Sequence, residues 1–348
     1  MKRYIDIITG RKCALASLLM AAFAAMSALA VSPTGDYSVT FTVSGYQGST
    51  SLENFPVLVR IKDDSPTAFH YVDCAADGSD IYFTDASGNA LAHEIDTWNI
   101  SGESLIWVKI PSVTPVAQGV AQFTMHYGTV IPAGITLPAA SSVWSSGYKG
   151  VWHLGETGAG GTSANSTAVG SALNGSNHSS TVDVVGKVDR ARQISDSTDT
   201  KNGKTGVILV DGKNEATDFN GVFTISGWFW HKNQAYYYDH LFYKRIASKD
   251  AAGGIAIEMA DNKDEIHIRG GDSASDAVVA KIATSTFKET WSLVTFVYND
   301  TTVTLYQDGE FKGRGTIAKA VDNKLNWAFG NNANGSDISW KGRLMKFA

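Results

Sequence analysis

The sequence predicts an all-β fold built from two antiparallel β-sandwiches. Charged residues make up only 18% of the chain, whereas glycine is abundant, with 34 residues in 348. Beyond the first thirty residues, no segment keeps the i, i+3, i+4 apolar spacing that a helix needs. Short alternating runs separated by Gly, Asn, Asp and Ser recur instead, which is typical of sandwiches and barrels.

Residues 1–30 have the composition of a cleavable signal peptide. Basic residues at the start precede the apolar run 14–26, and Ala28-Leu29-Ala30 is an A-x-A cleavage site. We expect cleavage after Ala30, and therefore a secreted or cell-surface protein. A membrane anchor is the alternative, but the apolar run is shorter than the roughly 20 residues that a span needs.

The net charge limits the partners. The chain carries a formal charge of −5, and the expected cleavage removes more cations than anions. An acidic surface repels phosphate backbones and anionic lipids, so we expect neither nucleic acid nor a membrane as partner. Cys74 is the only cysteine beyond the expected cleavage site, so the fold depends on burial rather than on an intrachain disulfide.

The first domain is expected at residues 31–138. Tyr37–Val43 alternates strictly, and Phe55–Ile61 places three apolar residues on one face. Four further strands are expected at 80–84, 91–98, 105–110 and 122–127. The Pro-, Ala- and Ser-rich stretch that follows contains a linker, which we place at 139–147.

This domain resembles the bacterial DUF2341 family, a domain of unknown function. The resemblance implies an extracellular β domain that often stands beside binding modules, with no established activity. It depends on five segments in family order: Asn54–Val59, Asp80–Asp85, Glu94–Trp98, Trp107–Pro111 and Met125–Gly128.

The second domain is expected at residues 148–348. Its strands are expected at 150–156, 221–230, 291–298 and 302–306, with the last two forming a hairpin, and Asp308-Gly309 is expected to form a tight turn. It resembles the laminin-G-like, concanavalin A-like jelly-roll family through Val151–Leu154, Phe223–Trp228, Trp291–Tyr298 and Val303–Gly309. That fold hosts lectins, adhesion modules and glycoside hydrolases alike. The closing run Gly342–Phe347 lacks the family's acidic pair, so we expect a short last strand or a truncated relative of longer proteins.

The most suggestive catalytic motif is Glu94-Ile-Asp-Thr-Trp98. It is similar to the Glu-x-Asp-x-Glu or Glu-x-Asp-x-x-Glu strand of laminarinase-like glucanases, whose first and last glutamates are nucleophile and acid/base. Here Trp98 or Asn99 stands where the second glutamate belongs, and neither transfers a proton in that role. We therefore expect no catalysis from this segment.

Two groups are candidates for ligand binding. Glu94, Asp96 and Trp98 alternate along one strand and would share a face, with Ile95 turned towards the core. They would bind a sugar or contribute to a calcium site, or else form a solvated strand face with a packing tryptophan. Tyr236, Tyr237 and Tyr238 follow a strand and would stack on sugars or cover the sandwich edge.

The remaining aromatic, histidine and acidic residues favour structural roles or leave their role open. Trp228 and Trp230 share a strand face, with Phe229 on the other, and we expect Trp228 in the core. The eight histidines show no metal-binding spacing. Acidic loops at 183, 196–199 and 261–264 leave Ca²⁺ open as a cofactor, although none has the spacing of a calcium loop.

The sequence thus predicts a secreted, non-catalytic protein that binds an extracellular polymer, with carbohydrate as the first choice. One alternative is an adhesion or structural protein that binds protein partners at the cell surface. Another is an accessory fragment of a glycoside hydrolase.

Overall fold

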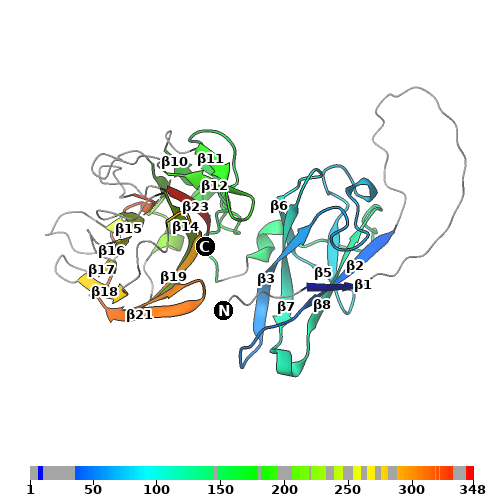
Figure 1. Cartoon of the computed structure of the whole chain (residues 1–348), viewed down its shortest axis with the longest axis horizontal. Coiled ribbons are helices and arrows are strands. Elements are labelled where there is room, and N and C mark those ends of the chain that lie inside the picture. The colour runs from blue at the N-terminus through cyan, green and yellow to red at the C-terminus, as the bar shows by residue number, and fades with distance from the viewer. Residues whose placement is uncertain are drawn as a thin grey trace, which may run out of the picture. The chain divides into compact units, whose positions relative to one another are not determined.

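A computed structural model divides the chain into two compact units, residues 1–145 and 146–348. The described residues contain strands and five short 3₁₀ helices but no α-helix, which confirms the all-β prediction (Figure 1). Within these residues, nothing helical has the length and apolarity to cross a membrane. The structure describes residues 7–10, 36–144, 147–178, 182–194, 206–218, 221–232, 239–245, 254–259, 265–270, 276–280, 288–317, 319–320, 322–331 and 342–348.

Unit 1 consists of two antiparallel sheets. The first has the order β1 (Ile7–Gly10), β2 (Tyr37–Val43), β8 (Ala121–Tyr127), β4 (Tyr82–Asp85), β5 (Ala90–Leu91). The second has the order β3 (Leu52–Ile61), β7 (Ser104–Val113), β6 (His93–Thr97). Three 3₁₀ helices lie in the connections: η1 (Tyr71–Asp73), η2 (Val116–Gln118) and η3 (Ala140–Val143).

The core of unit 1 follows from strand alternation. In β2, Val39, Phe41 and Val43 are buried while the residues between them are half-buried, as a sheet with one covered face requires. The apolar residues of β3 and β7 complete the same cluster. Cys74 belongs to this core, and burial raises the pKa of its thiol, which agrees with a packing role.

Part of the segment expected as a linker packs on unit 1. Helix η3 contacts β6 and β7, and Trp144, which follows it, is only 6% exposed. Strand β1 lies in the segment expected as a signal peptide and pairs antiparallel with β2. Export itself stays a prediction.

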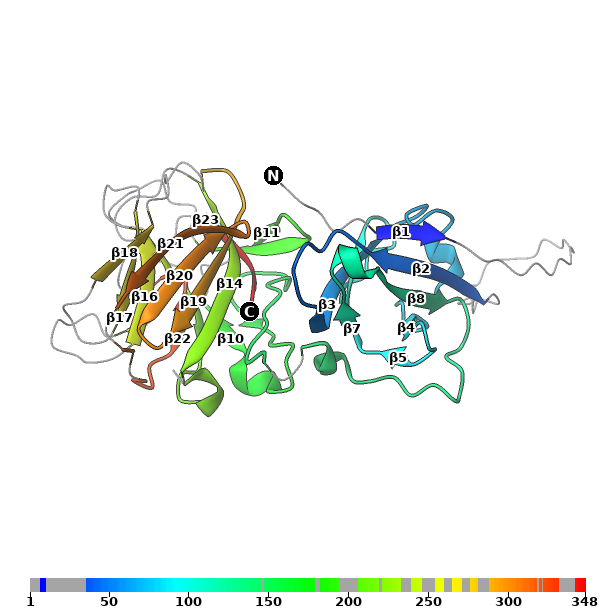
Figure 2. The same ribbon diagram turned by 90° about the horizontal axis from the view of Figure 1, so that it is seen from below.

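Unit 2 is a sandwich of two larger antiparallel sheets, whose strands Figure 2 shows lengthwise. The eight-stranded sheet has the order β18 (Asp276–Ala280), β17 (Ile266–Gly270), β16 (Gly254–Met259), β15 (His240–Arg245), β22 (Trp327–Phe329), β13 (Ile208–Val210), β10 (Gly175–Asn177), β9 (Thr162–Ser163). The seven-stranded sheet has the order β11 (Val182–Val185), β12 (Arg190–Gln193), β23 (Gly342–Phe347), β14 (Val222–His231), β19 (Ser292–Asn299), β20 (Thr302–Gln307), β21 (Glu310–Thr316). Two 3₁₀ helices, η4 (Gly170–Leu173) and η5 (Glu215–Thr217), lie in the connections between strands of unit 2.

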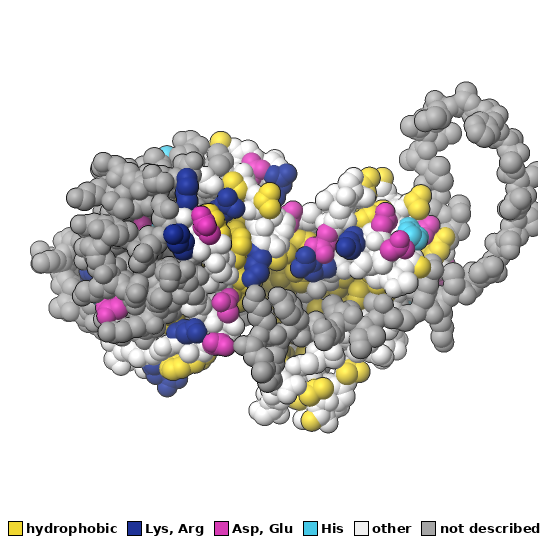
Figure 3. All heavy atoms as spheres, viewed as in Figure 1, with side chains coloured by type: hydrophobic (Ala, Val, Ile, Leu, Met, Phe, Trp, Pro, Cys, Tyr) yellow, Lys and Arg dark blue, Asp and Glu magenta, His cyan; other side chains and the backbone are white. Residues whose placement is uncertain are grey.

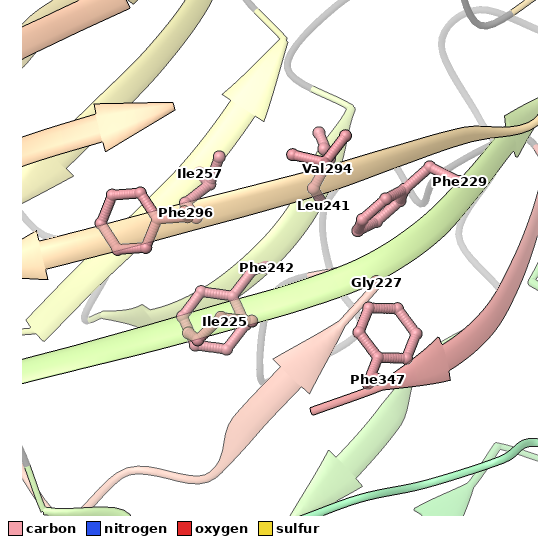
Figure 4. Close-up of a pocket in the computed structure, with 9 residues that line it drawn as sticks. All are labelled: Ile225, Gly227, Phe229, Leu241, Phe242, Ile257, Val294, Phe296 and Phe347. Carbon is pink, nitrogen blue, oxygen red and sulfur yellow. The ribbon is translucent and has the colours of Figure 1, made fainter. Parts of the chain in front are cut away.

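An apolar core separates the two sheets of unit 2. Figure 4 shows side chains from β14, β19, β15 and β16 converging on a small cavity in this core, together with Phe347 of β23. Gly227 of β14 pairs with Phe347 of the neighbouring strand β23, and a Cβ atom at Gly227 would come within 2.4 Å of the Phe347 ring. Glycine therefore leaves room for this ring to pack over the backbone of β14.

The predicted hairpin is confirmed, and so is the turn after it. Strands β19 and β20 pair antiparallel in register, and Asp308 and Gly309 both have positive φ between β20 and β21. The closing strand β23 lies inside its sheet, between β12 and β14.

The prediction of a strand at 150–156 is wrong. Only Trp152 forms isolated bridges there, one of them to Phe347, and Leu154 has a positive φ that breaks the extended backbone.

Candidate functional site

The carboxylates expected in unit 1 lie on β6, an edge strand. Pairing with β7 shifts register between Ile95 and Thr97, which places Asp96 in a β-bulge. Because a bulge inserts one extra residue, the alternation of side chains is interrupted there. Glu94 faces Trp107 of β7, while Ile95 packs against the core as expected.

Trp98 therefore separates from the two carboxylates. It packs against the core of unit 1 and meets the Tyr71 ring edge-on, with centroids 5.2 Å apart. Its indole N–H donates to the Ala76 carbonyl at 2.9 Å. The expectation of one acid–acid–indole row is wrong, because the bulge turns Trp98 to the other side of the strand.

Two other tryptophans take up the carboxylates. Trp107 Nε1 donates to Asp96 Oδ2 at 3.1 Å, and Trp144 Nε1 donates to Glu94 Oε2 at 2.5 Å. The centroids of the Trp107 and Trp144 rings are 5.1 Å apart. Sequence reasoning missed both residues. Cross-strand pairing could have suggested Trp107, but the contact of Trp144 is non-local and leaves no local signal.

In unit 2, the tryptophans of β14 lie on the outer face of the seven-stranded sheet. Phe229 is 4% exposed and belongs to the core between the sheets, whereas Trp228 and Trp230 are half-buried and outside that core. Because neighbouring residues of a strand lie on opposite faces, Trp228 and Trp230 point outwards where Phe229 points into the core. The expectation that Trp228 lies in the core is wrong.

Each of these indoles has a cation over its ring. The Lys187 ammonium lies 4.1 Å from the Trp228 centroid, and the Arg343 guanidinium lies 4.3 Å from the Trp230 centroid. Both distances are within cation–π range. We call these four residues the indole–cation face. Figure 3 shows Lys and Arg side chains among hydrophobic and acidic ones on the side of unit 2 that it presents.

The same sheet face continues across β19, β20 and β21. Ser226 pairs with Thr295 in register, and their hydroxyls are 3.0 Å apart. Thr295 in turn pairs with Tyr306, whose ring meets Phe311 at 6.1 Å. Phe311 is 59% exposed. Indoles, hydroxyls and two further rings therefore line one side of the sheet.

The outward face of the other sheet carries a buried charged group. Glu258 is 3% exposed, accepts from Arg269 Nε at 2.7 Å and lies 3.3 Å from His240 Nε2. Burial disfavours its ionised form, but the hydrogen bond and charge of His240, together with Arg269, outweigh it and lower the pKa. The tyrosines expected to bind a ligand, Tyr236, Tyr237 and Tyr238, precede β15 and lie outside the described residues.

A general acid needs a raised pKa, whereas the pKa of Glu258 is lowered. Across the residues that the structure places, no group of three or more His, Cys, Asp or Glu is suited to a metal ion. Asp183 is held by the Gly158 N–H and paired with Arg190, so protein donors already satisfy its carboxylate. The other acidic loops, at 196–199 and 261–264, lie outside the described ranges.

Three solved structures are among those similar to the chain. Domain 4 of the extracellular arabinanase AbnA from Geobacillus stearothermophilus, in complex with arabinotriose, is 18% identical, covering 48% of this chain and 73% of that one, with a TM-score of 0.36. The carbohydrate-binding module CBM66 from Bacillus subtilis is 11% identical, covering 48% and 88%, with a TM-score of 0.30. A putative carbohydrate binding protein from Bacteroides ovatus is 11% identical, covering 90% and 74%, with a TM-score of 0.30.

Family models match both parts of the chain. No curated protein sequence matches it. Residues 77–135 match DUF2341, the domain of unknown function, and residues 200–348 match the concanavalin A-like lectin/glucanases superfamily. The two matched segments stand in the order that the sequence resemblances predicted.

Proposed function

We propose that this is a secreted, non-catalytic carbohydrate-binding protein, and that unit 2 binds the glycan on its indole–cation face. The observation that carries the proposal is the outward placement of Trp228 and Trp230 on one strand. Neighbouring outward residues of a strand are about 7 Å apart, so the two rings offer adjacent platforms. The match to a superfamily of lectins and glucanases supports the same conclusion.

The chemistry of this face suits a sugar chain. Aromatic side chains combine a large apolar surface with a polar edge, which complements the apolar faces and hydroxyl edges of sugars. The hydroxyls of Ser226 and Thr295 lie beside the rings and can exchange hydrogen bonds with sugar hydroxyls. The exposed ring of Phe311 extends the platform across the sheet.

The hydrogen bonds and ion pairs of the described carboxylates disfavour a glycosidase role. Glu94 and Asp96 accept hydrogen bonds from indoles, and Glu258 is paired with Arg269 and His240. Retaining hydrolysis needs two carboxyl groups about 5–5.5 Å apart with one of them protonated. Incubating the chain with β-glucans tests this point: new reducing ends that form with the wild-type chain but not with Glu258→Gln or Glu94→Gln would contradict it.

The binding proposal is tested by titrating soluble polysaccharides into the full chain by calorimetry. Trp228→Ala and Trp230→Ala should each weaken binding at least tenfold, which is about 1.4 kcal/mol. Trp107→Ala is the matched control, since it removes a half-buried indole from unit 1. Unchanged affinity in both unit 2 variants, or loss only in the control, would contradict the proposal.

Export is tested separately. The mature protein recovered from the medium or cell surface of an expressing bacterium should begin at Val31. An N-terminus at Met1 in that fraction would contradict cleavage after Ala30.

A further inference from the structure

The cations over the two indoles indicate which kind of glycan fits. Lys187 lies in the turn between β11 and β12 and is exposed, with its ammonium over Trp228. Arg343 lies within β23, and its guanidinium covers Trp230. We propose that the indole–cation face binds a carboxylated polysaccharide, one that contains uronic acid residues. The inference rests on the proposed function and names the ligand class for the same site.

The argument starts from what a ligand must displace. A sugar that stacks on Trp228 takes the place that the Lys187 ammonium occupies over the ring. A neutral sugar breaks this cation–π contact without replacing it. A uronate breaks the same contact but offers its carboxylate to the displaced ammonium, which forms a charge-assisted hydrogen bond. The face therefore discriminates in favour of a sugar with both an apolar face and a carboxylate.

Arg343 strengthens the preference. Its Nη1 donates to the Val185 carbonyl at 3.4 Å, so the guanidinium is held across the edge of β11 as well as over Trp230. A planar guanidinium presents paired N–H donors that match the two oxygens of a carboxylate. A sugar that stacks on Trp230 displaces the guanidinium from the ring, and the carboxylate of a uronate then becomes its new partner.

The charges around the face agree with this assignment. The chain as a whole is acidic, with a formal charge of −5, yet this face gathers cations over its aromatic rings. Of the nearby acids, Asp183 is paired with Arg190. Asp189 lies in the same turn as Lys187, so the cationic character of the face comes from the position of Lys187 and Arg343 over the rings rather than from an absence of acids. A local cationic site on an acidic protein selects an anionic ligand by position rather than by bulk charge.

The experiment compares matched polymers on the full chain. Polygalacturonate, alginate and hyaluronate are titrated by calorimetry beside their carboxyl-reduced, neutral forms at two salt concentrations. At least one carboxylated polymer should bind tenfold or more tightly than its reduced form, which is about 1.4 kcal/mol. This preference should shrink as salt rises, because exposed charges are screened.

Charge variants locate the effect. Lys187→Gln and Arg343→Gln should each weaken binding of the carboxylated polymer about fivefold or more and leave the reduced polymer nearly unchanged. Lys213→Gln is the control, because it removes one exposed cation elsewhere in unit 2. Since Lys187 is exposed in a turn, its variant should fold normally.

The outcomes separate the two proposals. Equal binding of carboxylated and reduced polymers, lost in Trp228→Ala, would overturn the inference and leave carbohydrate binding intact. Carboxylate-selective binding that is unchanged in both charge variants would also overturn the inference. A chain that binds none of these polymers or any neutral glycan would overturn both.

Discussion

The two residues Trp228 and Phe229 are neighbours in sequence but should respond very differently to truncation. Phe229 is 4% exposed, lines the core cavity and meets Phe347 edge-on at 5.5 Å. Phe229→Ala removes a fully packed ring from the core, and such changes cost about 3–5 kcal/mol. For a unit of about 200 residues this corresponds to a fall in Tm of about 6–20 °C.

Trp228→Ala removes a half-buried ring and one cation–π contact. Partial loss of its buried area together with about 0.5–1 kcal/mol for the exposed cation–π contact gives a cost of about 1–2 kcal/mol. The Tm should then fall by about 2–8 °C. Binding should show the opposite order, with Trp228→Ala weakening it at least tenfold.

Calorimetric melting of the full chain measures both variants, with the unit 2 transition identified as the one that shifts to lower temperature in Phe229→Ala. A Trp228→Ala variant that melts as early as Phe229→Ala would place Trp228 in the core. That result would refute the assignment of the outward face, and with it the proposed binding site.

Three further outcomes follow from the structure. Gly227→Ala forces a Cβ atom to within 2.4 Å of Phe347 and should cost about 1–3 kcal/mol in urea unfolding, whereas an unchanged midpoint would mean that β23 yields freely. Because the pKa of Glu258 is lowered in the folded chain, its contribution is present above its ordinary value of 4.5 and is lost as pH falls through the folded value. The Glu258→Gln variant should therefore have a lower Tm than wild type at pH 7, and its Tm should change less than that of wild type below pH 4.5. Parallel plots of Tm against pH for the two proteins would contradict the pairing. Glu94→Gln should loosen Trp144 at a cost of about 1 kcal/mol and shift tryptophan emission to the red, and an unaltered spectrum would count against that hydrogen bond.

Local patterns predicted much of the fold. Alternation is enough to identify β2, because one of its faces is buried and the other is not. The hairpin of β19 and β20 and the turn at Asp308 were predictable for a similar reason, since turn chemistry acts over a few residues. These features need no knowledge of distant partners.

The features that sequence reasoning missed depend on distant partners. Alternation shows that Trp228 and Phe229 face opposite ways, but only the pairing of β14 with β23 decides which of them meets the core. The bulge at Asp96 likewise depends on β7, and it separates Trp98 from Glu94. The site residues Lys187 and Arg343 approach the indoles from other strands and carry no motif.

The most direct test of the account locates the bound glycan among the tryptophans. The chain is labelled with 5-fluorotryptophan, its ¹⁹F resonances are assigned by single Trp→Phe variants, and the carboxylated polymer that binds in calorimetry is titrated in. The account predicts that the Trp228 and Trp230 resonances shift on binding while those of Trp107 and Trp144 do not. Shifts confined to Trp107 and Trp144, with Trp228 and Trp230 unmoved at saturation, would contradict it.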